Sequence, residues 1–357
     1  MAKTIATTRI LPSALRHFKN SYKEVIKDVS NRATVILIRN SVDDVVPITL
    51  RNSVVGEIGT LIERVFVGAD GRNAFAEDGY TPLSAYAALL NESIVEVTLR
   101  TVMAHRDWLK RQLPEDVFGY LESAIRVDPV SEATVFKPRP FAGYDAAHTW
   151  VDPSGYTLSD RIWRTGTFTR QQIDAMVSEG IREGTGALEL ARQLERFLQP
   201  DQIMSRTKKP YGTDASYSAI RLARTELAHA FNEAALIAAQ LNPFVEKMDI
   251  ARSARGDPKC AICARHATID ISGNRVKEPI PLDEIKVPPF HPNDMCNVRA
   301  YVDTDTKDIV AQLRSYMGMP NVQPHINPTR GVGFVRQLLN RALDGVIHVV
   351  ARRLGIL

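Results

Sequence analysis

Residues 256–267 have the sequence GDPKCAICARHA, and residues 288–301 have the sequence PPFHPNDMCNVRAY. These two stretches contain all the cysteines of the chain. A C-x2-C turn directs two thiolates at one ion, and three thiolates with one imidazole suit tetrahedral zinc, with Zn–S distances of about 2.3 Å. The sequence therefore predicts a zinc site whose ligands are Cys260, Cys263, His291 and Cys296.

Four protein ligands leave no open coordination position, so the predicted ion is structural and not hydrolytic. His266 lies three residues after Cys263 and is an alternative to His291. Two further alternatives remain open: buried cysteines without a metal, and a redox C-x-x-C pair, which no βαβ pattern supports.

The segment 256–297, here called the Cys/His lobe, is rich in Pro, Gly, Asp and Lys and has few large apolar residues. Such a segment buries too little apolar surface to offset its loss of chain entropy. Structural zinc supplies roughly 10–16 kcal/mol of apparent binding energy in small domains, against a typical domain stability of about 5–15 kcal/mol. We therefore expect a metal ion to decide whether this lobe folds.

The rest of the chain has mainly helical periodicity. Apolar spacing or helix-forming composition predicts helices over residues 12–31, 42–67, 81–113, 157–166, 168–184, 185–198 and 218–242. Strands are expected at 245–255 and 297–303, and the β-branched run ATVILIR at 33–39 is a further candidate strand. The predicted fold class is α+β, mainly α-helical, with a helical bundle and a small zinc-clipped β lobe.

Changes in composition divide the chain into four predicted regions. They are an N-terminal helical region at 1–126, a Pro-rich connector at 127–156, a central domain at 157–302 that includes the Cys/His lobe, and a basic helical tail at 303–357. The small alanines at 228–239 are expected to be core residues that allow close helix packing.

The overall composition excludes several classes of protein. The chain has 357 residues, with 45 Lys plus Arg against 41 Asp plus Glu, and its net charge of +4 is too small for a general nucleic-acid binder. Three cysteines exclude a disulfide-rich scaffold. No signal peptide and no membrane span are expected, because no sufficiently long apolar run occurs.

Three motifs occur in an order that resembles the phage Mu F-like minor head proteins, also called phage head morphogenesis proteins. Residues 168–184 fit F-T-x-x-Q-I-x-x-M-V-x-x-G-I-x-x-G. An Arg-Thr-Glu helix with a following Asn comes next, and a D-x-x-C-x-x-C segment precedes a late His-Pro and Cys. The resemblance covers roughly residues 157–302, and the matching residues outside the zinc ligands are Arg224, Glu226, Asn232 and Asp257.

The resemblance implies a minor capsid component of a tailed phage or prophage, assembled in the host cytoplasm and present in the virion. Its implied partners are the portal protein, the major capsid protein or both, with an influence on packaging or release of DNA. The family pattern usually ends in His-Pro-x-Cys-x-Cys, whereas this chain has HPNDMC, so Asn293 or Asp294 stands where the first of these cysteines is expected. Three possibilities remain open for Glu226: it braces the Cys/His lobe, it pairs with Arg252 or Arg255, or it lies on a solvated charged face.

The last residues, 330–357, have helical apolar spacing and an excess of arginine. Such a tail can dock on a membrane, an acidic protein or packaged DNA, or it can pack on its own domain.

The sequence lacks the P-loop, dinucleotide-binding, zinc-protease and nucleophile-elbow motifs, so no catalytic residues are predicted. The alternative enzyme is a zinc-braced His-Asn-His-like nuclease. It would depend on Asp257, His266, His291 and Asp294, but it generally needs a second C-x2-C that this chain lacks.

Overall fold

The computed structural model describes residues 7–77, 81–124, 150–152, 154–198, 215–240, 244–253, 258–291 and 294–302, together with residues 5, 242, 310, 311 and 314. Most of the predicted connector at 127–156 and nearly all of the predicted tail at 303–357 lie outside these residues.

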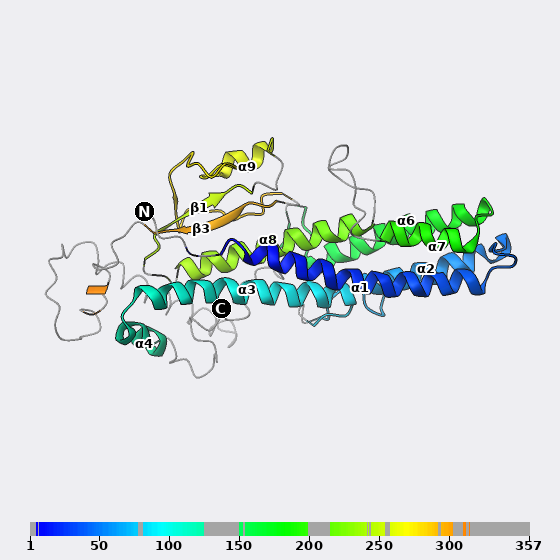
Figure 1. Ribbon diagram of the computed structural model, residues 1–357, viewed down its shortest axis with the longest axis horizontal. Helices are drawn as coiled ribbons and strands as arrows, with labels where there is room; N and C mark the ends of the chain where they lie inside the picture. The colour runs from blue at the N-terminus through cyan, green and yellow to red at the C-terminus, as the bar shows by residue number, and fades with distance from the viewer. Residues whose placement is uncertain are drawn as a thin grey trace. The chain divides into compact units, whose positions relative to one another are not determined.

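The described chain is mainly helical and has one small sheet (Figure 1). Its helices are α1 (Ile10–Arg39), the 3-10 helix η1 (Ile48–Leu50), α2 (Arg51–Phe66), α3 (Ala85–Gln112), α4 (Glu115–Ala124), α6 (Leu158–Arg182), α7 (Ala187–Leu198), α8 (Ala215–Gln240) and α9 (Ala261–His266). Its strands are β1 (Lys247–Ala251), β2 (Ile280–Pro281) and β3 (Asn297–Tyr301). The predicted fold class, α+β and mainly α-helical, is confirmed.

The chain forms two compact units, each made of segments that are distant in sequence. The bundle unit comprises Leu11–Val97 and Tyr144–Leu227, and the sheet unit comprises Met1–Ile10, Thr98–Gly143 and Ala228–Leu357. Helices α3 and α8 each contribute residues to both units. The units therefore differ from the contiguous ranges 1–126 and 157–302 that composition indicates.

Aromatic side chains form part of the core of the bundle unit. Phe18 and Tyr22 of α1 stack with ring centroids 5.9 Å apart, and Tyr86 of α3 meets both rings edge-on. The hydroxyl of Tyr86 donates to the carbonyl of Ala219 in α8 at 2.6 Å. The side chain of Tyr86 is fully buried, and this hydrogen bond gives its hydroxyl group a partner.

Helix α6 is continuous, so the prediction of two helices separated at Gly166 is wrong. The helix begins with a capping box, in which Thr157 and Asp160 exchange hydrogen bonds with each other's backbone N–H. Gly166 lies where α6 packs against α2, and a Cβ atom added to it would be 2.6 Å from Cβ of Phe66. The glycine permits close helix packing there and does not end the helix.

The candidate strand at residues 33–39 is also wrong, because these residues form the last turns of α1. Ile36 and Leu37 are buried on the helix, whereas Val35 and Ile38 are exposed. β-branched residues carry only a weak local preference, and the preceding amphipathic turns extend the helix through them.

The sheet unit contains an antiparallel sheet with strand order β2-β1-β3. The predicted strands at 245–255 and 297–303 correspond to β1 and β3, which pair from Lys247 with Tyr301 to Ala251 with Asn297. The predicted alanine core is confirmed, because the side chains at 228, 230, 234, 235, 238 and 239 are all buried.

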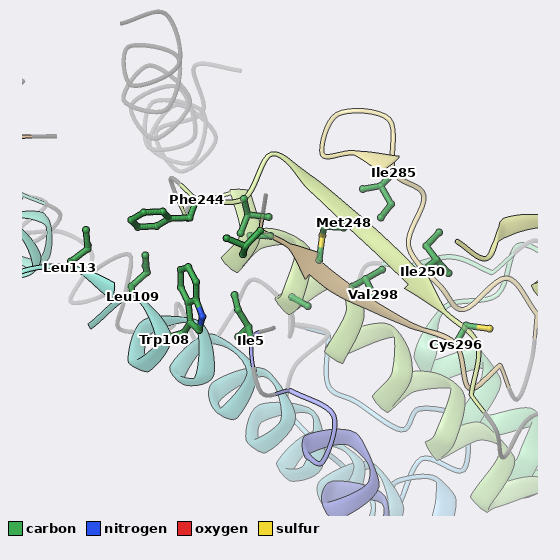
Figure 2. Close-up of a cluster of buried hydrophobic side chains, with 14 of the residues drawn as sticks. Ile5, Trp108, Leu109, Leu113, Phe244, Met248, Ile250, Ile285, Cys296 and Val298 are labelled. Atoms are coloured by element: carbon green, nitrogen blue, oxygen red, sulfur yellow. The ribbon is translucent and has the colours of Figure 1, made fainter. Parts of the chain in front are cut away.

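One hydrophobic cluster joins the sheet to α3 and α8 (Figure 2). Trp108 of α3 meets Phe244 edge-on with ring centroids 5.5 Å apart. The Cys/His lobe contributes Cys263, Ile285 and Cys296 to the same cluster. The lobe therefore shares a core with the rest of its unit, which the composition of residues 256–297 alone does not indicate.

Within the described residues, no helix has the length and apolar character that crossing a bilayer requires.

Replacing Gly166 with alanine is expected to destabilise the protein by about 1–3 kcal/mol, because the new methyl group overlaps the buried Phe66 side chain. Urea unfolding measures the change. The matched control is Gly56→Ala in α2, where nothing lies within 4 Å of the added Cβ, and which should stabilise the helix by about 0.5–1 kcal/mol. Equal effects of the two substitutions would contradict the close packing of α2 and α6.

Candidate metal centre

The C-x2-C segment forms the first half of the candidate metal centre. Cys260 is the N-cap of α9, and its sulfur accepts a hydrogen bond from the backbone N–H of Cys263 at 3.4 Å. This local turn brings the two sulfurs to one side, as the spacing predicts. Cys263 is buried and Cys260 is half-buried.

His291 lies against both sulfurs. Its Nε2 atom is 3.2 Å from Sγ of Cys260 and 3.1 Å from Sγ of Cys263. The three donor atoms all lie within 4.8 Å of one another. These residues are 31 and 28 positions apart in sequence, so the fold brings the imidazole to the C-x2-C turn.

A second group of donors shares Cys263 with the first. It consists of Cys263, Asp294 and Cys296, all buried and with donor atoms within 4.8 Å of one another. Oδ1 of Asp294 lies 3.5 Å from Sγ of Cys263 and accepts from the backbone N–H of Cys296 at 2.8 Å. Its other oxygen accepts from the N–H of Phe290 at 2.9 Å.

Asp294 is a donor that the sequence indicates only under the nuclease alternative. It stands in HPNDMC two residues before Cys296, where the family pattern has a cysteine. That spacing is the signal by which it could have been found. Its side chain is 1% exposed and has no Lys or Arg partner within the described part of the chain.

Burial dominates the acid–base properties of Cys263 and Cys296, but not of Cys260. It raises the pKa of Cys263 to about 12 and raises that of Cys296 further, and the nearby Asp294 carboxylate acts in the same direction. For Cys260, burial is outweighed by the N–H of Cys263 and by His291, which bring the thiol pKa below its ordinary value. A divalent cation among these groups would favour the thiolate form of each.

The donor set could hold a metal ion, and an ideal tetrahedral site gives a scale for the separations of its atoms. Tetrahedral coordination with Zn–S of about 2.3 Å and Zn–N of about 2.0 Å places sulfur and nitrogen about 3.5 Å apart. The observed separations of 3.1 and 3.2 Å are close to that value. Cys260, Cys263 and His291 would hold the ion, and Cys296 or Asp294 completes the set.

His266 does not reach this cluster. Its ring stacks on Phe290 with centroids 4.2 Å apart and an interplanar angle of 20°. The structure therefore places His291, and not the alternative His266, beside the sulfurs. Asp257 lies outside the described residues.

Asn232 of α8 holds the loop that carries His291 and Cys296. Its side-chain amide donates to the carbonyls of Pro288 at 3.2 Å and Cys296 at 3.3 Å. Its oxygen accepts from the N–H of Val298 at 2.9 Å. The side chain is fully buried, at 0% exposure, so these bonds connect α8 to both ends of the loop.

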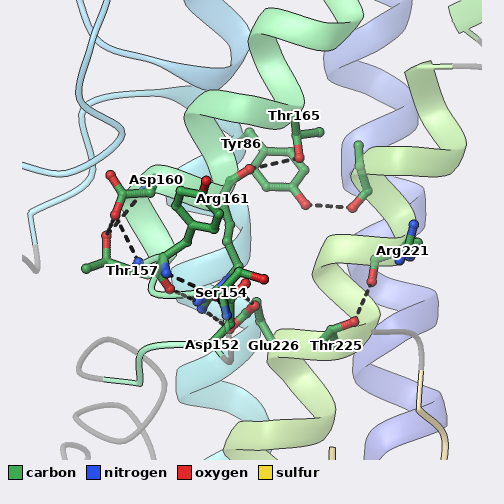
Figure 3. Close-up of polar contacts among 12 residues, drawn as sticks. Tyr86, Asp152, Ser154, Thr157, Asp160, Arg161, Thr165, Arg221, Thr225 and Glu226 are labelled. Atoms are coloured by element: carbon green, nitrogen blue, oxygen red, sulfur yellow. Dashed lines mark hydrogen bonds and ion pairs between the residues drawn. The ribbon is translucent and has the colours of Figure 1, made fainter. Parts of the chain in front are cut away.

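Glu226, one and a half turns earlier on α8, does not brace the lobe. Its carboxylate pairs with Arg161 of α6 through two contacts of 3.0 Å (Figure 3). The guanidinium of Arg161 also lies over the ring of Trp150 at 4.6 Å and donates to the carbonyl of Tyr156.

The expectation that Glu226 pairs with Arg252 is therefore wrong, and Arg255 lies outside the described residues. Burial raises the pKa of Glu226 to about 7, against the opposing effect of Arg161. Through Arg161 the pair connects Trp150 and Tyr156 to α6 and α8. Arg224 is half-buried on α8.

Replacing Asn232 with alanine is expected to lower the free energy of unfolding by about 2–4 kcal/mol, because buried carbonyl and N–H groups lose their partner. Asn232→Asp should also destabilise, since a carboxylate would face two carbonyl oxygens. Urea unfolding gives the energy, and hydrogen exchange at the Val298 amide should become faster.

The exposed Asn52→Ala on α2 is the control and should change stability by less than about 0.5 kcal/mol. A similarly small effect at Asn232 would show that the loop does not depend on this side chain.

Comparisons with protein-family models, curated proteins and solved structures gave no match. The arrangement of these residues and the order of the motifs therefore carry the functional conclusion.

Proposed function

We propose that the protein is a minor capsid component of a tailed bacteriophage or prophage, acting in head assembly as a binding and scaffolding protein. The observation that carries this proposal is the role of Asn232. In the family that the sequence resembles, an Asn follows the Arg-Thr-Glu helix and the Cys/His segment comes later. Here that Asn forms hydrogen bonds with the Cys/His loop. The two motifs are therefore in direct contact, which supports reading them as parts of one structure.

The proposed cofactor is a structural zinc ion. Cys260, Cys263 and His291 supply soft donors from one side, and Cys296 or Asp294 supplies the remaining donor. When bound, the ion would neutralise the buried thiolates and link α9 to the start of β3. A site closed by protein donors leaves no position for a hydrolytic water, which favours a structural role.

The proposed partners are the portal protein, the major capsid protein or both, with the location in the virion after assembly in the host cytoplasm. The basic residues 330–357 are proposed to contact packaged DNA. The buried Asn232 and Glu226 do not serve as contact residues in this proposal, because each is fully occupied inside its own unit.

Protein purified without chelators is expected to contain about one zinc per chain by elemental analysis. Cys263→Ser and His291→Ala should lose most of the metal, because both residues belong to the group around the sulfurs. Zinc removal should lower the melting temperature, since binding energy contributes to folding. His266→Ala is the matched control and should retain zinc; metal loss in this variant alone would contradict the assignment of His291.

The assembly role is tested by following the tagged chain in a lysate of its own induced phage or prophage. The full chain should co-sediment with heads, and Cys263→Ser should be depleted from them because its lobe is unfolded. A chain lacking residues 330–357 should show reduced incorporation if the tail docks inside the head. Absence of the full chain from purified heads would refute the proposal.

The nuclease alternative is examined in the same preparation. Plasmid DNA incubated with the protein and Mg²⁺ or Mn²⁺ should remain intact. Cleavage that disappears in Cys263→Ser would favour the nuclease instead.

A further inference from the structure

The exposed side of the Cys/His lobe carries three cationic side chains around His266. They are Arg265 at the end of α9, Lys277 in the following loop and Lys286 after β2. All three are exposed, and none forms an ion pair with a described residue. Their positive charge acts on His266, whose pKa is lowered first by burial and then by these three neighbours, against the opposing effect of Asp294.

The fold holds these cations close together. The backbone N–H of Lys277 donates to the carbonyl of Thr268 at 3.3 Å, which places this residue beside the end of α9. The Nζ atom of Lys277 then donates to the carbonyl of Arg265. Like charges that gather on one surface repel one another, and an anionic partner lowers that cost.

An aromatic platform lies among the cations. His266 is partly exposed and stacks on Phe290 at 4.2 Å. Phe290 packs in turn against the hydrophobic cluster of the sheet unit, so the pair of rings rests on a rigid base. An aromatic ring with basic side chains nearby is an arrangement with which proteins bind single-stranded nucleic acid, through phosphate contacts and base stacking.

We propose that this surface, formed by Arg265, His266, Lys277, Lys286 and Phe290, binds a nucleic-acid strand with accessible bases. The cations contact phosphates, and a base stacks on the His266 ring. An acidic protein would pair with the cations but would not stack on the His266 ring. A nucleic acid explains both features, so it is the partner that we favour. This inference goes beyond the structural role proposed above and is separate from the basic tail at 330–357.

The first experiment measures the charge contribution in the full-length protein. Fluorescence anisotropy follows a labelled 16-nucleotide oligothymidine at several salt concentrations. The variant Arg265→Gln/Lys277→Gln/Lys286→Gln should bind about tenfold more weakly at low salt, and the slope of log K against log salt should fall by about two. The control Arg16→Gln/Lys27→Gln/Arg64→Gln removes the same charge from exposed positions of the bundle unit and should leave the slope unchanged.

The second experiment isolates the stacking contribution. His266→Ala should weaken oligothymidine binding by at least about fivefold without changing the salt slope, because it removes no phosphate contact. It should not weaken binding of an abasic strand with the same phosphates. His266→Phe keeps a ring on Phe290 and should retain the affinity.

Zinc content and melting temperature are measured for each variant. A variant that keeps both but binds the oligonucleotide weakly has lost nucleic-acid binding and not the metal or the fold. Three outcomes would overturn the proposal. They are unchanged binding by the triple lobe variant, equal weakening by the bundle-unit control, and equal affinity for polyaspartate of matched charge, which would identify an acidic protein surface as the partner.

Discussion

The hydrogen bonds of one buried amide set the geometry on which the candidate metal centre depends. Asn232 satisfies two carbonyls and one N–H of a loop that has little regular structure to satisfy them. Buried backbone groups without partners are costly, so this side chain stabilises one loop conformation over others. The position of His291, the position of Cys296 and the start of β3 all follow from that conformation.

The second constraint is electrostatic. Three thiols, an imidazole and a carboxylate meet at the edge of a hydrophobic cluster, and burial raises the pKa of Cys263 and Cys296. Asp294 adds a buried carboxyl group to these donors. Groups of this kind are stable together when a cation is shared among them, so a bound ion would link metal binding to folding of the lobe.

Helix α8 carries two buried polar residues, each of which binds an irregular segment of a different unit. Glu226 fastens residues 150–156 through Arg161, and Asn232 fastens the Cys/His loop. Their separation of six residues places each within a different part of the same helix. The polar residues of the Arg-Thr-Glu helix therefore form hydrogen bonds or ion pairs that hold two irregular segments. This role explains why they occur among the buried alanines of the helix.

Much of this structure was accessible from sequence because it depends on local periodicity. The helical rhythm of residues 12–31 and the turn geometry of C-x2-C are local properties, and each has the expected form in the structure. Local sequence patterns predict the wrong secondary structure at two places where tertiary packing determines it. The helix propensity of glycine predicts a helix end at Gly166, but this residue lies inside α6 and packs on Phe66. The β-branched composition of residues 33–39 predicts a strand, but these residues continue α1.

The amino-acid sequence by itself determined the mainly helical α+β class and indicated the three cysteines as candidate donors, because periodicity, spacing and residue type are local properties. Only the tertiary structure decided that His291 and not His266 faces the sulfurs, that Asp294 joins them, and that Glu226 pairs with Arg161. These partners are distant along the chain, and their meeting depends on how α6, α8 and the strands pack, which no local pattern encodes.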